Sequence, residues 1–195
     1  MVHASPASAK TVMRLEMRAR RRVLAEDAPE AARRAAALLP LDRLPPFTVV
    51  SGYRALGAEI DPWPLMQRLR DAGARLALPM ASGREVPLTF RAWAPGDPLE
   101  PDAFGIPSPR GDAPEVQPDL VIAPLVAFDR GGGRLGQGAG HYDRTIANLR
   151  AAKPVFVLGL AYAGQEVAAA PAEPHDERLD AILTETGYMA ARKDI

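Results

Sequence analysis

A glycine-rich segment from residue 129 to residue 144 offers the clearest chemistry in this sequence. It reads DRGGGRLGQGAGHYDR, with six glycines in sixteen residues and Arg134 near its middle. An apolar run precedes the segment, and a helical pattern begins at its end. Glycine turns and helix starts present free backbone N–H groups to anions, and a guanidinium can bind two phosphate oxygens at once. We therefore predict a phosphate-binding loop, with a purely structural glycine loop as the alternative.

Basic residues near the N-terminus could complete such a site. Lys10 and Arg14 are one helical turn apart, so both side chains can point at the same ligand. They begin a basic stripe that continues with Arg18, Arg21 and Arg22. Charged stripes of this kind are most often solvated surface, so the pattern leaves both interpretations open.

Acidic residues supply candidate metal and substrate ligands. Asp143 falls in the first turn of the helix after the glycine segment, where a carboxylate either favours the helix start or holds Mg²⁺ on phosphate oxygens. His175 and Asp176 lie in a second acidic cluster and either orient a turn or contribute to a site. Glu59 lies between a predicted strand and a predicted helix. It is either a helix-start residue or a carboxylate that faces a cationic or N–H-bearing substrate.

Other nucleotide-binding motifs match this segment less well. Residues 131–136 fit G-x-G-x-x-G, but the dinucleotide fingerprint follows a first strand and places an acid about 20 residues later. The glycines here come late in the chain, and the sequence AAKP occupies the region of that acid at residues 151–154. No Gly-Lys-Ser/Thr follows the glycines, which excludes a P-loop.

Composition narrows the class of protein. The 195 residues hold 24 Lys and Arg against 24 Asp and Glu, a formal net charge of 0, and no cysteine. A neutral chain argues against a general nucleic-acid or membrane-surface protein, and a chain without cysteine has no disulfides or thiolate sites. No apolar run approaches the ~18 residues of a membrane span, and no signal-peptide core is visible. We predict a cytoplasmic monomer without nucleic-acid or membrane partners.

Hydrophobic periodicity predicts helices that alternate with short strands. The predicted helices cover residues 8–25, 29–39, 61–73 and 141–151, and the predicted strands cover residues 47–53, 75–79, 86–93, 119–128, 155–160 and 181–184. In the third helix, Asp61 is the expected N-cap and Pro62 the first helical residue. One side of the first helix is apolar: Val12, Leu15, Ala19 and Val23.

This element order predicts a single α/β domain over residues 1–195, with residues 1–7 as a flexible lead-in. The expected architecture is a Rossmann-like, three-layer α/β/α sandwich with a mostly parallel sheet. Ligands of such sheets bind beyond the carboxyl ends of the strands, which is where the glycine-rich segment falls.

Together these motifs resemble the 5-formyltetrahydrofolate cyclo-ligase family, also called 5,10-methenyltetrahydrofolate synthetases. The resemblance runs in order through nearly the whole chain. Its segments are K-x-x-x-R at 10–14, G-Y-x(5)-E at 52–59, L-P at 78–79, F-G-I-P at 104–107, P-D-L-V-I-A-P-L-V-A-F-D at 118–129, G-R-L-G-x-G-x-G-x-Y-D-R at 133–144, P-x-E-x-H-D-x-x-L-D at 171–180 and T-E at 184–185. The long central motif is highly specific, whereas the others are individually weak.

The resemblance implies an ATP- and Mg²⁺-dependent enzyme that converts 5-formyltetrahydrofolate to 5,10-methenyltetrahydrofolate and releases ADP and phosphate. In the family, the formyl oxygen attacks the γ-phosphate to give an N5-iminium phosphate. N10 then closes onto the formyl carbon, and phosphate leaves. Phosphoryl transfer of this kind needs mainly positioning and charge neutralisation.

The resemblance also implies residue roles. Lys10 and Arg134 are the expected catalytic cations, and Asp143 and Asp176 the expected magnesium ligands. The implied ATP-binding residues are Lys10, Arg14, Arg134, Leu135, Gly136, Gln137, Gly138, Ala139, Gly140, His141 and Tyr142. The implied substrate-binding residues are Arg54, Glu59, Gly136, Gln137, Gly138, Ala139, Gly140 and His141.

The central motif departs from its commonest form, G-Y-G-G-G-Y-Y-D, at Gln137, Ala139 and His141. His141 replaces an aromatic hydroxyl, and its imidazole can still stack or donate a hydrogen bond. A diverged relative that binds ATP but acts on another substrate is therefore the first alternative. A dinucleotide-dependent oxidoreductase is the second, and a non-catalytic RNA-binding module on the basic helix is the third.

Overall fold

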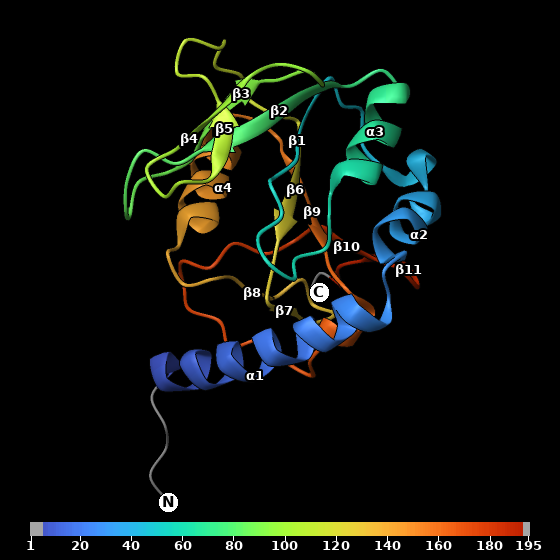
Figure 1. The fold of residues 1–195 in the computed structure, drawn as a ribbon. Helices are drawn as coiled ribbons and strands as arrows, with labels where there is room; N and C mark the ends of the chain where they lie inside the picture. The colour runs from blue at the N-terminus through green and yellow to red at the C-terminus, as the bar shows by residue number, and fades with distance from the viewer. Residues whose placement is uncertain (1–5, 193–195) are drawn as a thin grey trace, which may run out of the picture.

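In the computed structural model, which describes residues 6–192, the chain folds around one seven-stranded sheet with two small hairpins beside it (Figure 1). The helices are α1 (Pro6–Asp27), α2 (Ala31–Leu38), α3 (Trp63–Asp71) and α4 (His141–Ala152), with 3₁₀ turns η1 (Leu41–Arg43) and η2 (Ala163–Gln165). The strands are β1 (Val49–Ser51), β2 (Arg75–Met80), β3 (Thr89–Ala92), β4 (Leu99–Pro101), β5 (Pro107–Pro109), β6 (Leu120–Pro124), β7 (Ala127–Phe128), β8 (Arg134–Leu135), β9 (Phe156–Leu160), β10 (Ala181–Thr184) and β11 (Gly187–Ala190).

The sheet has the strand order β11-β10-β9-β6-β1-β2-β3. Its five inner strands are parallel, and the two edge strands β11 and β3 run antiparallel to their neighbours. Parallel neighbours need crossover connections, and α3 supplies one between β1 and β2. The predicted Rossmann-like, mostly parallel sheet is confirmed.

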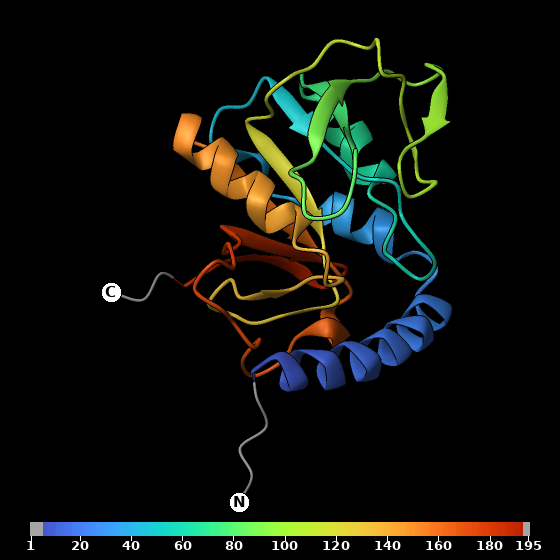
Figure 2. The ribbon, with the colours of Figure 1, turned by 90° about the vertical axis from the view of Figure 1, so that its left-hand side faces the viewer.

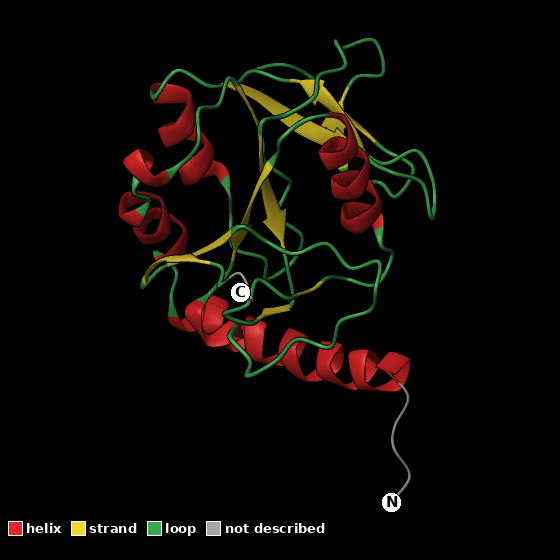
Figure 3. Cartoon of the chain, turned by 180° about the vertical axis from the view of Figure 1, so that it is seen from behind, coloured by secondary structure: helices red, strands yellow, loops and turns green. Residues whose placement is uncertain are grey.

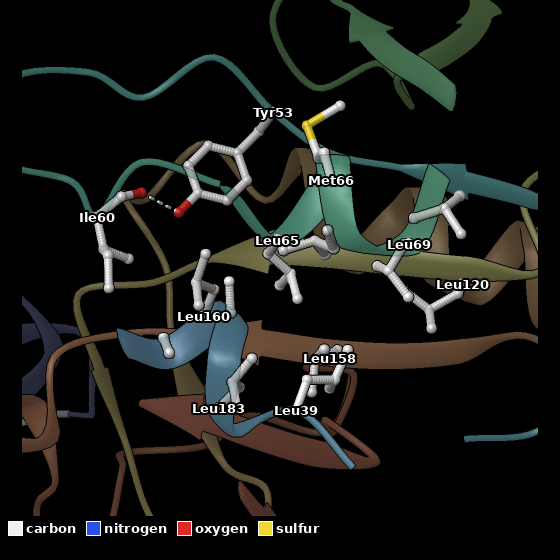
Figure 4. Packing of buried hydrophobic residues seen from close by; sticks show 14 of the residues in the cluster. Leu39, Tyr53, Ile60, Leu65, Met66, Leu69, Leu120, Leu158, Leu160 and Leu183 are labelled. Atoms are coloured by element: carbon white, nitrogen blue, oxygen red, sulfur yellow. Dashed lines mark hydrogen bonds between the residues drawn. The ribbon is translucent and has the colours of Figure 1, made fainter. Parts of the chain in front are cut away.

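Helices cover both faces of the sheet, which gives the three predicted layers (Figure 3). On one face, Leu65 and Leu69 of α3 pack with Leu39, Leu120 and Leu158, all of them nearly inaccessible to water (Figure 4). Burying one leucine side chain stabilises the fold by about 1.5–3 kcal/mol. This layer therefore anchors the inner strands whose ends carry the site.

The opposite face of the sheet is covered by α4. Ile146 and Leu149 of this helix pack with Val121 of β6 and Val157 of β9. They are one helical turn apart (i and i+3), so they share a face of the helix. This packing fixes the start of α4 at the carboxyl ends of the strands.

Helix α1 crosses the carboxyl ends of the strands instead of lying on either face of the sheet (Figures 1 and 2). From residue 9 onward, the buried residues of α1 are Lys10, Met17 and Arg21, whereas Val12 and Leu15 on its predicted apolar side are 52% and 65% exposed. The interpretation of the basic stripe as solvated surface is therefore wrong at Lys10 and Arg21. The carboxyl ends of the strands present hydrogen-bond acceptors, namely carbonyl oxygens and acidic side chains. A helix packed against them therefore buries side chains that donate hydrogen bonds.

The apolar run at 119–128 is not one strand, which corrects the prediction. β6 ends at Pro124, and the chain bends before β7, which pairs with β8 in a separate hairpin. The turn of this hairpin contains Gly131, Gly132 and Gly133, and Asp129 Oδ1 accepts the N–H groups of Gly131 and Gly133 at 2.9 Å. The Gly132 N–H is bonded to the Asp129 carbonyl, so the N–H groups of the first three glycines are engaged within the hairpin, and none of the three lines the cavity described below.

Several element boundaries also differ from the prediction. Helix α3 begins at Trp63 with Pro62 as its N-cap, and Asp61 Oδ1 accepts the Trp63 N–H at 3.0 Å. The strand predicted at 86–93 is shortened to β3 because the Leu88 N–H is bonded to Thr145 Oγ1. The β4–β5 hairpin and the edge strand β11 were not predicted. Residues 1–5 of the predicted lead-in lie outside the described residues, and residues 6 and 7 belong to α1.

Asp119 ties the starts of β1 and β6 together. Its Oδ2 accepts the N–H groups of Thr48 and Val49 at 2.8 and 2.9 Å, and Lys153 Nζ donates to its Oδ1 at 2.6 Å. Burial alone would raise the pKa of Asp119, but the hydrogen bonds from Lys153 and the two amides lower it below its usual value.

Replacing Asp119 by Asn is expected to lower the free energy of unfolding by about 1–3 kcal/mol at neutral pH. Because the folded pKa is lowered, the carboxylate stabilises the fold above its ordinary pKa, and this contribution disappears as the pH falls through the folded value. Urea unfolding of both proteins between pH 3 and 7 measures the difference. A difference that stays constant over this range would contradict the assignment.

Candidate functional site

A cavity of about 340 Å³ opens at the carboxyl ends of β1, β2 and β6, a size typical of small-molecule sites. Its walls come from α1, from the loop after β1, from the loop at 136–140 and from the segment at 173–176. Every residue predicted to act in the site lines it: Lys10, Arg14, Arg54, Glu59, Arg134, Leu135, Gly136, Gln137, Gly138, Ala139, Gly140, His141, Tyr142, Asp143 and Asp176. The prediction that a ligand site lies beyond the strand ends thus coincides with the observed cavity.

Arg134 lies on β8 with its side chain only 3% exposed. Its Nη2 donates to Asp143 Oδ1 at 2.7 Å, and its guanidinium lies 5.7 Å from the centre of the Tyr142 ring. Its Nε is buried and has no hydrogen-bond partner. A buried donor without a partner is costly, and the residue itself lines the cavity.

Lys10 is also buried and lines the cavity. Its Nζ donates to Glu173 Oε2 at 2.6 Å and to Asp176 Oδ2 at 2.7 Å. Burial alone would lower the pKa of Lys10, but the two carboxylates outweigh burial and raise it. Burial would raise the pKa of Asp176, and the hydrogen bond from Lys10 lowers it instead. Lys10 and Asp176 are therefore both charged at neutral pH.

The loop at 136–140 is held against α1 by its carbonyl groups. Arg14 Nε donates to the Gly136 carbonyl at 3.0 Å, and Arg18 Nη2 donates to the Gln137 carbonyl at 3.0 Å. Gly138 and Gly140 have φ of 112° and 66°, a region that suits glycine. Among the described residues Glu85 is the non-glycine with positive φ, so alanine at position 139 costs no backbone strain.

Glu59 lies at the cavity wall with its side chain 5% exposed. Its Oε2 accepts the Leu56 N–H at 3.0 Å, and its Oε1 accepts Gln137 Nε2 at 2.9 Å. Arg21 Nη1 lies 3.5 Å from the same Oε1. Helix α3 begins four residues later, so Glu59 is not a capping residue; it is a buried carboxylate that lines the cavity.

An apolar wall faces these charges. The His141 ring lies 5.3 Å from the Phe104 ring, and its Nε2 is 3.0 Å from the Gly83 carbonyl. Asp102 shapes the Phe104 segment because its Oδ1 accepts the N–H groups of Phe104 and Ile106. Aromatic side chains of this kind can pack against planar rings, so the cavity is lined by aromatic as well as charged groups.

The acidic groups have the chemistry of a hard-cation site. In the described part of the chain, Glu173, His175 and Asp176 bring three possible ligand atoms within 4.8 Å of one another. Asp143 is not in this group. Carboxylate oxygens suit Mg²⁺, but both predicted ligands, Asp143 and Asp176, are bonded to cationic side chains. A metal ion would have to share these oxygens with Arg134 and Lys10 or displace those cations.

Sequence reasoning missed several lining residues, among them Glu173, Phe104 and Tyr53, and the buried neighbour Arg21. The signal for Arg21 was present, since Lys10, Arg14 and Arg21 recur at helical spacing. Phe104 lies in the F-G-I-P motif of the resemblance, but its place at the cavity was not predicted, because it lies in a proline-rich connection whose path periodicity does not predict.

Comparisons with known proteins agree with one another. A family model described as the 5-formyltetrahydrofolate cyclo-ligase family matches residues 6–185. A 5-formyltetrahydrofolate cyclo-ligase of Mycolicibacterium smegmatis is 35% identical over 152 residues, which cover 73% of this chain and 77% of the relative. The enzyme of that name from Escherichia coli K12 is 36% identical over 143 residues, covering 69% of this chain and 76% of the relative.

Solved structures show the same likeness. The solution structure of Aquifex aeolicus 5,10-methenyltetrahydrofolate synthetase superposes with a TM-score of 0.74 at 27% identity and covers 95% of this chain and 94% of its own. A synthetase of that name from Mycoplasma pneumoniae, at 20% identity, has a TM-score of 0.70 and covers 90% and 98%. The second likeness supports the fold alone. Among the described residues, no helix has the length and apolar character needed to span a membrane.

Replacing Lys10 by Met is expected to raise the pKa of Asp176, because the hydrogen bond that now lowers it is lost. NMR titration of the side-chain carboxyl groups measures this directly. Replacement of Arg20, an exposed residue of the same helix, is the control and is expected to leave the titration unchanged. An unchanged Asp176 in the Lys10 variant would show that the pair does not form in solution.

Proposed function

Because the chain belongs to the 5-formyltetrahydrofolate cyclo-ligase family, we propose that it converts 5-formyltetrahydrofolate to 5,10-methenyltetrahydrofolate with consumption of ATP and a requirement for Mg²⁺. The other products are ADP and phosphate. The observation that supports this most is a single cavity lined by two buried cations, Lys10 and Arg134, and by a buried carboxylate, Glu59.

The proposed reaction has two steps. The formyl oxygen attacks the γ-phosphorus of ATP, so an oxygen–phosphorus bond forms, the bond to the β-phosphate oxygen breaks, and ADP leaves. In the resulting N5-iminium phosphate, N10 attacks the formyl carbon and loses its proton. The carbon–oxygen bond then breaks and phosphate departs. Neither step needs a covalent protein nucleophile, so the protein must supply position and charge.

Lys10 and Arg134 are proposed to bind the phosphates of ATP. Both side chains are buried at the cavity wall and held in place by carboxylates, so each offers a cation that is positioned before the ligand arrives. Preorganised donors of this kind stabilise the charge that develops in a transition state. Arg14 and the remaining loop residues, with Tyr142, are proposed to form the rest of the nucleotide site.

Asp143 and Asp176 are proposed to hold Mg²⁺ with the nucleotide. The donor set fits the ion, since both carboxylates line the cavity and both now neutralise a cation that phosphate could take over. When bound, Mg²⁺ would neutralise charge on the phosphate oxygens. Phosphate would then pair with Lys10 and Arg134, and Mg²⁺ would pair with the two carboxylates. Every buried charge would keep a partner of opposite sign, which a low-dielectric site requires.

The folate is proposed to contact Glu59, Arg54, the loop at 136–140 and His141. A carboxylate accepts hydrogen bonds from ring N–H groups, and the ring of His141 beside Phe104 provides a flat wall. The substitutions at Gln137 and His141 favour a second candidate, a relative with the same ATP site and another substrate. The carboxylate at Glu59 and the flat wall opposite are what favour the folate.

The test is the appearance of the methenyltetrahydrofolate chromophore from 5-formyltetrahydrofolate. Formation that requires both ATP and Mg²⁺, and that stops on chelation with EDTA, is the expected result. ATP binding without product would contradict the folate assignment and favour the diverged relative. Product formed equally well without ATP or in EDTA would contradict the nucleotide and metal assignments.

Replacing Arg134 by Met is expected to lower kcat by about 10²–10³, the usual effect of removing one preorganised donor. The matched control is Arg130→Met, because Arg130 lies in the same hairpin but is exposed and bonded to Glu166. Steady-state kinetics at saturating ATP compares the two. Wild-type turnover in the Arg134 variant would refute its proposed role.

Replacing Glu59 by Gln is expected to raise the KM for the folate by about 10- to 100-fold, since hydrogen bonds to a charged group are worth about 1.5–3 kcal/mol. The KM for ATP should change little. Initial rates measured with each substrate varied in turn separate the two constants. Equal effects on both would assign Glu59 a structural role.

A further inference from the structure

Arg21 is a buried cation that the proposed reaction does not use. Its residue is 7% exposed, and its Nη1 donates to the Leu125 carbonyl at 3.1 Å. The same Nη1 lies 3.5 Å from Glu59 Oε1. Arg21 therefore stands between the end of the central strand β6 and the one carboxylate proposed to bind the folate.

Glu59 needs a cation because its side chain is only 5% exposed. An ionised carboxylate at that depth is costly unless it is paired and hydrogen-bonded. Its shorter hydrogen bonds come from the Leu56 N–H at 3.0 Å and from Gln137 Nε2 at 2.9 Å, both of them neutral donors, and a longer one comes from Arg21 at 3.5 Å. The cation at its side is Arg21, which approaches from the buried face of α1.

The Leu125 carbonyl fixes the position of Arg21. That carbonyl also accepts Gln165 Nε2 at 3.0 Å, and Gln165 donates to the Val126 carbonyl as well. The guanidinium is thus held by a network at the end of β6, not by Glu59 alone. Gln137, in contrast, is exposed, so a ligand can take its place on Glu59 while Arg21 stays.

We propose that Arg21 is a positioning residue that holds Glu59 as a fixed, charged acceptor for the N–H groups of the folate ring. The proposal rests on the proposed function. Arg21 acts through Glu59 and does not itself touch substrate. It also links α1, whose Lys10 and Arg14 line the nucleotide half of the cavity, to the substrate half.

Replacement of Arg21 by Met is a local change. The Leu125 carbonyl still accepts a hydrogen bond from Gln165, so the substitution does not leave this carbonyl without a donor. Methionine is unbranched and fills the space of the arginine stem. Arg21→Lys keeps the positive charge but loses the forked donors of the guanidinium. It serves as a second variant if the Met variant unfolds.

The experiment measures kcat and the KM for each substrate in wild type, Arg21→Met, Arg21→Lys and the control Arg22→Met, an exposed neighbour on the same helix. The expected result is a KM for 5-formyltetrahydrofolate raised about tenfold or more by Arg21→Met, with the KM for ATP within about twofold. Arg21→Lys should recover part of the loss. The double variant Arg21→Met/Glu59→Gln should be no worse than Glu59→Gln alone.

Three outcomes would overturn the positioning role. They are additive losses in the double variant, equal increases in both KM values, and an Arg21→Met enzyme that matches Arg22→Met. Binding of 5-formyltetrahydrofolate measured by calorimetry without ATP gives a second readout that does not depend on turnover. If wild type forms no product and binds no folate, the proposed function itself has failed, which is distinct from a failure confined to Arg21.

Discussion

The contact on which the site depends is the packing of the basic face of α1 against the carboxyl ends of the strands. A helix placed there would ordinarily bury apolar side chains. Here it buries Lys10 and Arg21 and leaves Leu15 exposed. Each buried cation finds carboxylates or carbonyls that come from distant parts of the chain. The sheet supplies the rigid carboxyl ends of the strands, and α1 packs across them and forms one wall of the cavity.

The ion pairs explain how such a charged cavity is stable without phosphate. Lys10 is neutralised by Glu173 and Asp176, and Arg134 by Asp143. Removing one member of a buried pair costs several kcal/mol, whereas exchanging it for another charge does not. The proposed nucleotide and its metal ion match this requirement, because phosphate can replace the carboxylates and Mg²⁺ can replace the cations.

The fold was predictable from the sequence where the signal was local and periodic. The helix that starts at His141 follows from its apolar spacing and the glycine before it, and the strand at 181–184 follows from its apolar run. The break after Pro124 was not predictable, because an apolar run gives no sign of which neighbour each residue pairs with. It was also not predictable that the basic stripe of α1 faces the interior, because hydrophobic spacing assigns the buried side of a helix to apolar residues.

The residues that line the cavity could be picked from the sequence, because the long central motif is specific and the weaker motifs lie in order along the chain. What the sequence could not show is the partner of each charge. The bond from Arg21 towards Glu59 joins residues 38 apart, and the bond from Lys10 to Asp176 joins residues 166 apart. Such pairs depend on tertiary packing, which no local pattern encodes.

The most direct test is a crystal structure of the protein with a non-hydrolysable ATP analogue, Mg²⁺ and 5-formyltetrahydrofolate. The expected result has the phosphates bonded to Lys10 and Arg134, the metal ion on Asp143 and Asp176, and the folate ring against Glu59. Phosphates bound elsewhere, with Lys10 still paired to both carboxylates, would contradict the exchange of ion pairs and with it the proposed site.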